Sequence, residues 1–549
     1  MKHLLLPLLC LFSFQAFSQA PTWAWAKGTG TGNKDVGSAI AVDGKGNSYV
    51  TGYYTASSIT FDTTTLTNAG TTDVFIAKYD SSGNVLWAKS AGGNNLEEGR
   101  AIAVDASGNC YVTGYFESSS ITFGSTILTN VNGIDIFIVK FDASGNVIWA
   151  KNVGGLGLVF GIAVDGNGNC YATGCFFSAS ISFGSTKLFN TGPNGSADIF
   201  IAKFDSSGNA VWAKSAGGNE DDVCTAISVD GRGNSNITGT FKSSSITFGS
   251  SMLTNIGGFC SGFPVTSCSD FLIAKFDANG NALWAKSAGG SSHDGGYGIA
   301  VDSNSNVYVT GYFAGLSITF DTTKLTNAGP FGSADVFTVK CDSNGNTIWA
   351  KNVGCGGDSR GIAVDGMGNS YVVGDFNSPC TFGTTTLNPG IFGDLFILKY
   401  DSSGNPVWGK SAGGDGSDRG QGIAVDGGGN CYITGCYDGS YISFGSTTLG
   451  SAGDNDFFVA RLGNPITGIE DVAKKAELSI APNPVKDILY LRSNNNKPLS
   501  GMAQIYDYTG RKVLEKTIDG KQAEINMQHL PPGLYWLKLG EEAMKIVKE

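Results

Sequence analysis

Residues 87–148 read WAKSAGGNNLEEGRAIAVDASGNCYVTGYFESSSITFGSTILTNVNGIDIFIVKFDASGNVI, and the pattern starts again at Trp149. The tryptophan of this Trp-(Ala or Gly)-Lys unit recurs seven times, at positions 25, 87, 149, 212, 284, 349 and 408. A second unit, Ile-(Ala or Ser)-Val-Asp, also ends seven times, at positions 43, 105, 165, 230, 302, 365 and 426. An internal repeat decides the architecture of a chain, so the fold prediction starts from these two independent counts of seven.

Each copy contains four short stretches that are typical of strands. In the copy quoted above they are 102–105, 110–116, 135–141 and 146–151, rich in β-branched and aromatic residues and bounded by Gly, Asn, Asp and Ser. Two five-residue turns join them in pairs, each with Asp at the start of a type I turn and Gly at the left-handed position. Seven four-stranded antiparallel units predict an all-β fold, a seven-bladed β-propeller.

The two ends of the repeat region indicate how the ring closes. Residues 23–27 are a fourth strand without a preceding three, and 456–461 are a third strand without a following fourth. We therefore expect the N-terminal strand to complete the seventh blade, which would leave no open sheet edge at the seam. We place this propeller at residues 19–463, and across about residues 23–463 the chain resembles the seven-bladed propeller repeat family of secreted bacterial proteins. The resemblance implies a fold and leaves the activity open, because one fold hosts many functions.

Charge and the N-terminal residues narrow the class of partner and the location. The chain has 549 residues and a formal net charge of −11 at pH 7. Nucleic acid and anionic membrane surfaces are therefore poor partners. Residues 1–18 are typical of a secretory signal, because a basic start and the apolar run Leu4 to Phe14 precede a small-residue cleavage site. That run is too short for a transmembrane anchor, and we expect no membrane-spanning segment after signal removal.

The sequence offers little for metal or acid–base chemistry. Cys260 and Cys268 share one loop, where they could form a disulfide. The cysteine spacings match no zinc site, and turn chemistry accounts for the Asp-x-x-Gly-Asn segments without calcium. His293 is the one histidine of the repeat region, so a nucleophile–histidine pair would have to use it. We expect no metal, no cofactor and no catalytic residue.

The repeat ends near residue 464, where the character of the chain changes. Residues 464–476 contain Pro465, Gly468 and a charged run, which is typical of a linker. Residues 477–549 alternate like strands and are broken by turns. This pattern predicts a small immunoglobulin-like β-sandwich.

The C-terminal region resembles the sorting domain of the type IX secretion system of Bacteroidetes. The motif residues that carry the match are Pro482, Asn483, Pro484, Gly510, Arg511, Gly533, Tyr535 and Lys545. The resemblance implies that the type IX secretion machinery is a partner. It also implies passage through the periplasm to the outer-membrane surface or the extracellular medium. The alternative is an ordinary immunoglobulin-like domain that stays attached.

The sequence says less about molecular activity than about location. We favour a non-enzymatic binding module for a protein or glycan, because no residue set specific to one blade resembles a catalytic centre. The alternatives are a polysaccharide lyase or glycoside hydrolase on the same scaffold, and a structural or adhesive surface component. Cations of the third strand, such as Lys140, recur in every copy. We expect them to be structural, with the Asp that ends the first strand as their partner.

Connections on one face of the propeller vary most, so we expect a ligand on that face. Blade four carries the long loop 250–269, with Phe259 and Phe263 as candidate contacts. Acids also occur five residues before the first-strand Ile, and they are Asp35, Glu97, Asp222, Asp294 and Asp418, with Asp358 one residue later in blade six. These six carboxylates predict a ring at the channel mouth that would attract a cationic partner. The alternative is that each acid caps its own blade by accepting backbone N–H bonds.

Overall fold

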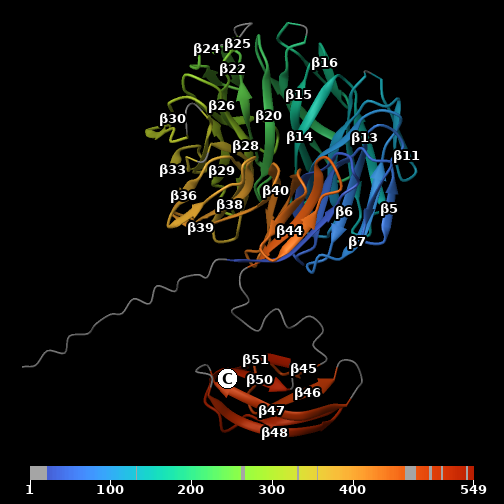
Figure 1. Ribbon diagram of the computed structural model, residues 1–549, viewed down its shortest axis with the longest axis vertical. Coiled ribbons are helices and arrows are strands. Elements are labelled where there is room, and N and C mark those ends of the chain that lie inside the picture. The colour runs from blue at the N-terminus through green and yellow to red at the C-terminus, as the bar shows by residue number, and fades with distance from the viewer. Residues whose placement is uncertain are drawn as a thin grey trace, which may run out of the picture. The chain divides into compact units, whose positions relative to one another are not determined.

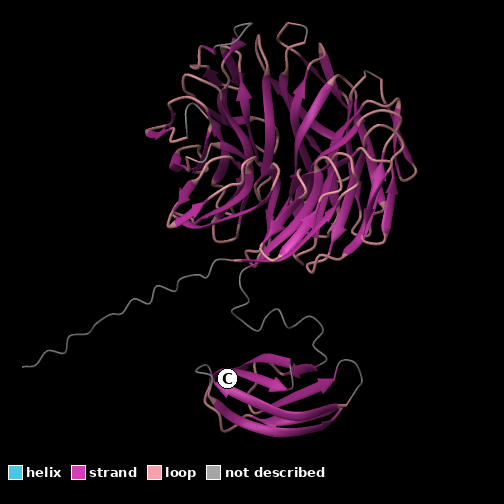
Figure 2. Ribbon diagram, viewed as in Figure 1, coloured by secondary structure: helices cyan, strands magenta, loops and turns pink. Residues whose placement is uncertain are grey.

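The structure is a computed structural model that describes residues 21–131, 133–193, 195–260, 266–329, 333–354, 356–463, 478–493, 498–507, 511–539 and 542–549. These residues form strands and loops without helices (Figure 2). Two units are present, Ala20–Gly463 and a second that contains Asn464–Glu549. No helix suited to crossing a membrane occurs in the described part of the chain. The expected signal at 1–18 and linker at 464–476 lie outside the described residues.

Seven antiparallel four-stranded blades make up the first unit and confirm the β-propeller (Figure 1). The first strands contact one another around the axis and are β2 (Asp35–Val42), β8 (Glu97–Val104), β14 (Gly157–Val164), β20 (Asp222–Val229), β28 (Asp294–Val301), β34 (Gly357–Val364) and β40 (Asp418–Val425). The second strands are β3 (Ser48–Tyr54), β9 (Cys110–Phe116), β15 (Cys170–Phe176), β21 (Ser235–Phe241), β29 (Val307–Phe313), β35 (Ser370–Phe376) and β41 (Cys431–Tyr437). The third strands are β6 (Asp73–Tyr79), β12 (Asp135–Phe141), β18 (Asp198–Phe204), β26 (Asp270–Phe276), β32 (Asp335–Cys341), β38 (Asp394–Tyr400) and β44 (Asp456–Gly463). The outer strands are β7 (Val85–Ala91), β13 (Val147–Val153), β19 (Ala210–Ala216), β27 (Ala282–Ala288), β33 (Thr347–Asn352), β39 (Pro406–Gly414) and, for blade seven, β1 (Thr22–Thr29).

The ring closes through strands from its two ends, as the sequence predicted. β1 pairs antiparallel with β44, from Thr22 opposite Gly463 to Thr29 opposite Phe457. Figure 1 shows the orange strands of the last blade beside the blue strands of the first, and β2 contacts β40, β41 and β44. Closure of this kind leaves no unpaired edge at the seam.

Each blade also contains a short hairpin that we did not predict from the sequence. The hairpins lie between the second and third strands and are β4 (Ser58–Phe61) with β5 (Thr64–Thr67), β10 (Ser120–Phe123) with β11 (Thr126–Thr129), β16 (Ser180–Phe183) with β17 (Thr186–Phe189), β22 (Ser245–Phe248) with β23 (Ser251–Thr254), β30 (Ser317–Phe320) with β31 (Thr323–Thr326), β36 (Cys380–Phe382) with β37 (Thr385–Leu387), and β42 (Tyr441–Phe444) with β43 (Thr447–Gly450). Ile59, Phe61 and Leu66 of the first hairpin are buried. β5 contacts β7 of its own blade, and β10 of the next blade contacts β7 as well. The hairpins therefore cover outer strands that would otherwise be exposed sheet edges.

The second unit is a β-sandwich. One sheet contains β45 (Leu478–Ala481), β46 (Ile488–Ser493) and β49 (Gln522–Asn526), and the other contains β48 (Lys512–Gly520), β47 (Leu499–Asp507), β50 (Gly533–Leu539) and β51 (Glu542–Lys548). Residues from both sheets, such as Leu489, Ile505 and Leu537, are fully buried in one apolar core. Alternation of apolar and polar residues along these strands places one face of each sheet inside.

Tryptophans of the outer strands connect neighbouring blades. Trp87 Nε1 donates a hydrogen bond to the carbonyl of Ala143, in the turn of the next blade, at 3.2 Å. Gly145 of the same turn has φ of 83°, and a Cβ there would lie 2.9 Å from the Trp87 ring. The indoles that make the same bond are Trp25, Trp149, Trp212, Trp284 and Trp349. Glycine is therefore needed at this turn position for two reasons. It adopts the left-handed backbone conformation, and it leaves room for the indole of the preceding blade.

A tyrosine of the second strand makes a second connection between blades. The Tyr49 hydroxyl lies 3.2 Å from Asp43 Oδ2 and 3.1 Å from the Gly108 carbonyl of the next blade. Lys78 Nζ lies 4.7 Å from the centre of the Tyr49 ring and donates to the Ala143 carbonyl at 3.0 Å. We had expected the first-strand Asp as the lysine's ion-pair partner. The tyrosine stands between the two groups instead, and the lysine gains a cation–π contact.

Blade four departs from this arrangement at two coupled positions. Asn236 replaces the tyrosine, and in blade five Ser305, with φ of 62°, replaces the turn glycine. Without a tyrosine between them, Lys275 Nζ and Asp230 Oδ2 form an ion pair at 3.6 Å. Burial acts to raise the pKa of Asp230, but hydrogen bonds, among them one from Ser305, hold it below its usual value. The serine hydroxyl thus supplies to Asp230 what the tyrosine hydroxyl supplies in other blades.

Replacing Gly208 with Ala should destabilise the propeller. Gly208 has φ of 81°, and its added Cβ would lie 2.8 Å from the Trp149 ring. The left-handed backbone alone should cost about 1–2 kcal/mol, and displacement of the indole should add to it. The measurement is the denaturation midpoint in urea. Gly166→Ala is the matched control in the same blade, because nothing lies within 4 Å of its Cβ position. Equal midpoints for the two variants would contradict this role of the turn glycine.

Candidate functional site

Every first strand carries a β-bulge at the same repeat position. In β8, Gly99 pairs with Gly114 and Ala101 pairs with Thr113, so Arg100 between them has no partner in the register. A bulge of this kind redirects a side chain, and bulges are enriched beside functional sites. The seven bulged residues are Ser38, Arg100, Phe160, Thr225, Tyr297, Arg360 and Gln421.

The seven bulged residues line one cavity on the propeller axis. Its volume is about 330 Å³, and Val36 and Tyr53 complete the lining. All seven bulged side chains are half-buried. We call this cavity the channel site. We did not predict this cavity from the sequence. One signal for it was present, because the residue two before the first-strand Ile differs in nearly every copy while its neighbours repeat.

One arginine of the channel site is held by a buried glutamate. Arg100 Nη2 lies 2.6 Å from Glu98 Oε2 and donates to the Tyr115 hydroxyl at 3.1 Å. Glu98 is 8% exposed. Burial acts to lower the pKa of Arg100, but the charge of Glu98 and the interactions with Tyr115 together raise that pKa above the usual value. The guanidinium is therefore a fixed and permanently charged group in the channel wall.

The second arginine is held by two carboxylates. Arg360 Nε donates to Asp375 Oδ1 at 3.2 Å, and Arg360 Nη2 lies 3.6 Å from Asp358 Oδ2. The guanidinium carbon lies 6.0 Å from the centre of the Tyr297 ring, which stacks on Tyr312 at 5.3 Å. Burial raises the pKa of Asp375 despite the opposing charge of Arg360. Aromatic and charged side chains thus lie next to each other in the wall formed by blades five and six.

Five of the six predicted acids do not face the channel. Asp35, Glu97, Asp222, Asp294 and Asp418 are completely buried. Their carboxylates accept hydrogen bonds at 2.6–3.2 Å, most of them from backbone N–H groups. Asp35 accepts from the Thr31 hydroxyl. The backbone donors are Gly93 N to Glu97, Lys242 N and Ser243 N to Asp222, Gly290 N to Asp294, and Gly414 N to Asp418. Their own N–H groups donate to the preceding blade, as Asp294 N does to the Ser269 carbonyl at 2.8 Å. We call these five acids the junction caps, because they lie where one blade meets the next. The predicted ring of exposed carboxylates at the channel mouth is therefore wrong for these five.

Asp358 differs from the other five acids because of its register. Gly357 pairs with Phe376, in the place where Asp35 pairs with Tyr54. Asp358 therefore occupies the position of Glu98, one residue further along the strand, and it reaches the channel site through Arg360. The spacing from the first-strand Ile had led us to predict Asp358 as a sixth member of the carboxylate ring.

The junction caps follow a pattern of paired residues. Each lies near the Asp that begins the third strand of the preceding blade, and the pairs are Asp456 with Asp35, Asp73 with Glu97, Asp198 with Asp222, Asp270 with Asp294, and Asp394 with Asp418. At the other two junctions the capping position is Gly157 or Gly357. There an amide takes over, because Asn152 and Asn352 donate to Asp135 and Asp335 at 3.4 and 2.7 Å.

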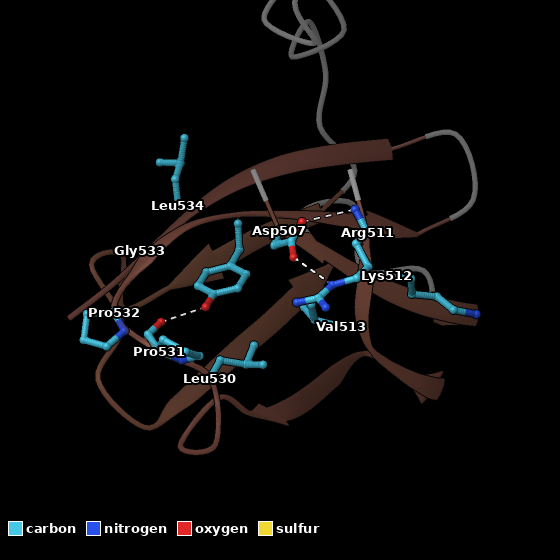
Figure 3. A pocket seen from close by; sticks show the side chains of 10 residues that line it. Asp507, Arg511, Lys512, Val513, Leu530, Pro531, Pro532, Gly533 and Leu534 are labelled. Atoms are coloured by element: carbon cyan, nitrogen blue, oxygen red, sulfur yellow. Dashed lines mark hydrogen bonds and ion pairs between the residues drawn. The ribbon is translucent and has the colours of Figure 1, made fainter. Parts of the chain in front are cut away.

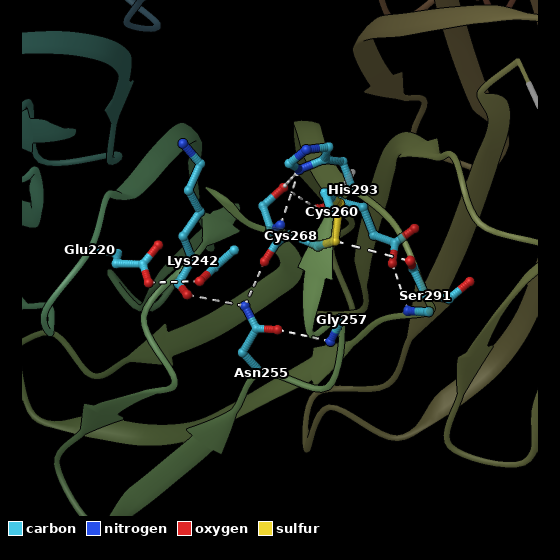
Figure 4. Close-up of a disulfide and its surroundings, with 12 residues drawn as sticks. Glu220, Lys242, Asn255, Gly257, Cys260, Cys268, Ser291 and His293 are labelled. Carbon is cyan, nitrogen blue, oxygen red and sulfur yellow. Dashed lines mark hydrogen bonds between the residues drawn. A yellow bond between two sulfur atoms is a disulfide. The ribbon is translucent and has the colours of Figure 1, made fainter. Parts of the chain in front are cut away.

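The long loop of blade four is fastened at three points (Figure 4). Cys260, at the end of β24 (Phe259–Cys260), forms a disulfide with Cys268, which follows β25 (Thr266–Ser267). Ser267 Oγ donates to Glu220 Oε1 at 2.6 Å, and Ser269 N donates to His293 Nδ1 at 3.1 Å. His293 thus anchors a loop, since its Nδ1 accepts a backbone N–H. Phe263 lies outside the described residues, as does the side chain of Phe259.

The motif residues of the C-terminal unit gather at two places. Arg511, Gly533 and Tyr535 line a cleft of about 540 Å³ (Figure 3). Arg511 Nε donates to Asp507 Oδ2 at 3.1 Å, and the Tyr535 hydroxyl donates to the Pro531 carbonyl at 2.7 Å.

The second place joins the Pro482-Asn483-Pro484 motif to the C-terminal strand. Asn483 Oδ1 accepts a hydrogen bond from Val547 N at 2.8 Å. Val485, which follows the motif, donates to the Val547 carbonyl at 2.7 Å and accepts from Glu549 N at 2.9 Å. Lys545 lies on β51, but its side chain and Gly510 are outside the described residues. The Pro482-Asn483-Pro484 end of the motif set is thus hydrogen-bonded to the C-terminal strand.

Comparison with known families identifies both units. Residues 479–549 match the secretion system C-terminal sorting domain, and residues 25–53 and 284–312 match the beta-propeller repeat. The chain is a β-propeller protein with a type IX sorting domain, as the motif residues predicted. That domain directs export through the type IX secretion machinery to the cell surface or the outside.

Individual relatives are more distant. An uncharacterized WD repeat-containing protein of Acanthamoeba polyphaga mimivirus is 25% identical, over 76% of this chain and 36% of that protein. The regulatory protein FlaEY of Caulobacter vibrioides is 30% identical, over 30% of this chain and 17% of that protein. The matches span well under half the length of either curated relative.

The comparison with solved structures gives matches of low TM-score. The WD40 domain of Neurospora crassa Pan2 has a TM-score of 0.40 and 10% identity, covering 82% of this chain and 97% of that one. PorZ of Porphyromonas gingivalis, an essential bacterial surface component of the type IX secretion system, has a TM-score of 0.22 and 12% identity, covering 94% of this chain and 82% of that one.

The junction caps should make the propeller less stable as the pH rises. Burial raises the pKa of Asp294 to about 7 and that of Asp418 to about 8, and the charges of Asp270 and Asp394 add to the shifts. The folded state therefore keeps protons that the unfolded chain releases near pH 4. The stability that the protonated caps contribute is fully present below about pH 4. It is lost as the pH rises to about 8, at about 1.4 kcal/mol for each unit by which folding raises the pKa of a cap. We expect a lower melting temperature at pH 8 than at pH 5.

The variant Asp294→Asn is the control for this pH dependence, because an amide keeps the shape of the cap but does not titrate. Its melting temperature should fall less between pH 5 and pH 8 than that of the native protein. A melting temperature that is constant or rises over this interval in the native protein would rule out protonated caps.

Proposed function

We propose that the protein is an exported binding module whose ligand occupies the channel site. The observation that carries this proposal is the set of seven bulges. At one repeat position, the scaffold presents Ser, Arg, Phe, Thr, Tyr, Arg and Gln to a common cavity. Positions that hold the ring together repeat from blade to blade, as the indoles and the turn glycines do. Diversity confined to one concave site on a rigid scaffold is typical of recognition.

The arrangement of charges supports binding over catalysis. Both channel arginines are engaged by carboxylates at 2.6–3.6 Å. Such pairs position side chains firmly. His293 accepts a backbone N–H of the blade-four loop. We therefore assign no proton-transfer role to it.

A variant with a filled channel tests the proposal. Glycan and peptide panels should be read with the full mature protein for both retention and product release, and we expect retention without product. Ser38→Trp places an indole in the channel site and should abolish retention. Ser107→Trp, in an exposed turn, is the matched control and should bind normally. Product release would identify an enzyme, and retention that survives Ser38→Trp would place the ligand elsewhere.

Removing the sorting domain should separate export from folding. The propeller closes between β1 and β44 and forms a unit of its own. Deletion of Glu477–Glu549 should therefore leave a folded propeller in the periplasm. Fractionation of cells, followed by limited proteolysis of the retained protein, measures both properties. Normal delivery of the truncated protein to the surface would contradict the sorting role.

A further inference from the structure

The wall of the channel site has two unlike arcs. Blades six, seven, one and two contribute the polar residues Arg360, Gln421, Ser38 and Arg100. Blades three to five contribute Phe160, Thr225 and Tyr297. The Thr225 hydroxyl donates a hydrogen bond to the Gly296 carbonyl at 2.7 Å, so it links blades four and five. Val36 and Tyr53 of blade one, both buried, complete the polar arc. A ligand that fills the cavity therefore contacts a mainly apolar wall on one side and a mainly polar wall on the other.

Both arginines of the polar arc are already paired with carboxylates. Arg100 is paired with Glu98, and Arg360 is paired with Asp375 and Asp358. An anionic ligand would meet these carboxylates, and a cationic ligand would meet the two guanidinium groups. Either would have to displace an ion pair that is at least partly desolvated, which is costly. The arrangement consequently favours an uncharged ligand.

The polar arc offers hydrogen-bond donors from its arginines and both a donor and an acceptor from Gln421. A guanidinium carries five N–H donors, and the described contacts of Arg360 use only two of its nitrogens. Gln421 has no hydrogen-bond partner among the residues that the structure describes, so its amide is free to donate and to accept. Planar groups of this kind match pairs of adjacent hydroxyls, each of which donates and accepts at once.

The apolar arc and the volume limit the size and shape of the ligand. Phe160 is half-buried in the wall, and the Tyr297 ring is held in place by its stack on Tyr312 at 5.3 Å. Fixed aromatic rings provide large contact areas for a flat apolar face. The volume of about 330 Å³ lies at the low end of small-molecule sites, which range over about 300–1,000 Å³.

Building on the proposed function, we infer that the ligand is an uncharged saccharide, of which one hexose-sized unit occupies the channel site. Its C–H face packs against Phe160 and Tyr297, and its hydroxyls bind Arg100, Arg360 and Gln421. The unit is either a free sugar or the terminal residue of a longer glycan.

Calorimetry on the full mature protein tests this inference with matched sugars. The panel contains neutral hexoses, the same hexoses as uronic acids and as amino sugars, neutral oligosaccharides, and short peptides. We expect a neutral sugar to bind at least about 100-fold more tightly than its charged analogues, because like charges in the wall oppose them. If the hexose and its oligosaccharide bind with equal affinity, the ligand is the terminal residue of a longer glycan. If the hexose binds and the oligosaccharide does not, the ligand is a free sugar.

Variants of the two arcs locate the contacts. Gln421→Ala should weaken binding about fivefold through lost hydrogen bonds, and Phe160→Ala about tenfold through lost ring contact. Phe189→Ala is the control for the second change, because Phe189 is 64% exposed on β17 and outside the channel. Melting temperatures check that each variant is folded.

The outcomes separate this inference from the proposed function. A charged sugar or a peptide that binds and is blocked by Ser38→Trp overturns the uncharged saccharide and leaves the binding module intact. Saccharide binding that persists in Ser38→Trp and in Phe160→Ala overturns both. Failure of every saccharide in the panel to bind the native protein overturns the saccharide inference.

Discussion

The propeller depends on hydrogen bonds that cross from one blade to the next. On one face, the Trp87 indole and the Tyr49 hydroxyl reach carbonyls in turns of blade two. On the other face, the first strand of six blades begins with an N–H group bound to the preceding blade, as in Asp294. Sheets packed only through apolar side chains can slide, because such contacts have no direction. Polar links at both ends of the junctions set the angle between blades, and with it the width of the channel that the seven bulges line.

These links constrain pairs of residues more tightly than single residues. Asn236 in place of a tyrosine occurs beside Ser305 in place of a glycine, and together they preserve a hydroxyl near Asp230. Asn152 and Asn352 occur where the next blade begins with glycine and has no capping acid. Each departure from the repeat is thus matched by another across the same junction. A buried carboxylate needs either a hydrogen-bond donor or a proton, and the two kinds of junction meet that need differently.

The sequence predicted the number of blades and the closing strand because both follow from periodicity. Strand-forming runs and Asp-Gly turns are local signals, and they recur often enough to be counted. The hairpins were missed, although Ser-Ile-Thr-Phe recurs in several copies, because the connection between second and third strands varies in length around them. The channel site was missed because a bulge shifts alternation by one residue. Side chains before it, such as Asp294, therefore point into the junction, while Tyr297 points to the axis.

Closing the ring with the first and last strands of the propeller also sets the order in which the protein matures. β1 is synthesised first, and its partner β44 is synthesised only after every other strand of the ring. Contacts between such distant residues form late in folding, because a long loop must close before they are made. The sorting domain follows β44 in the chain. A molecule whose translation stops before β44 therefore has neither a closed ring nor a sorting domain.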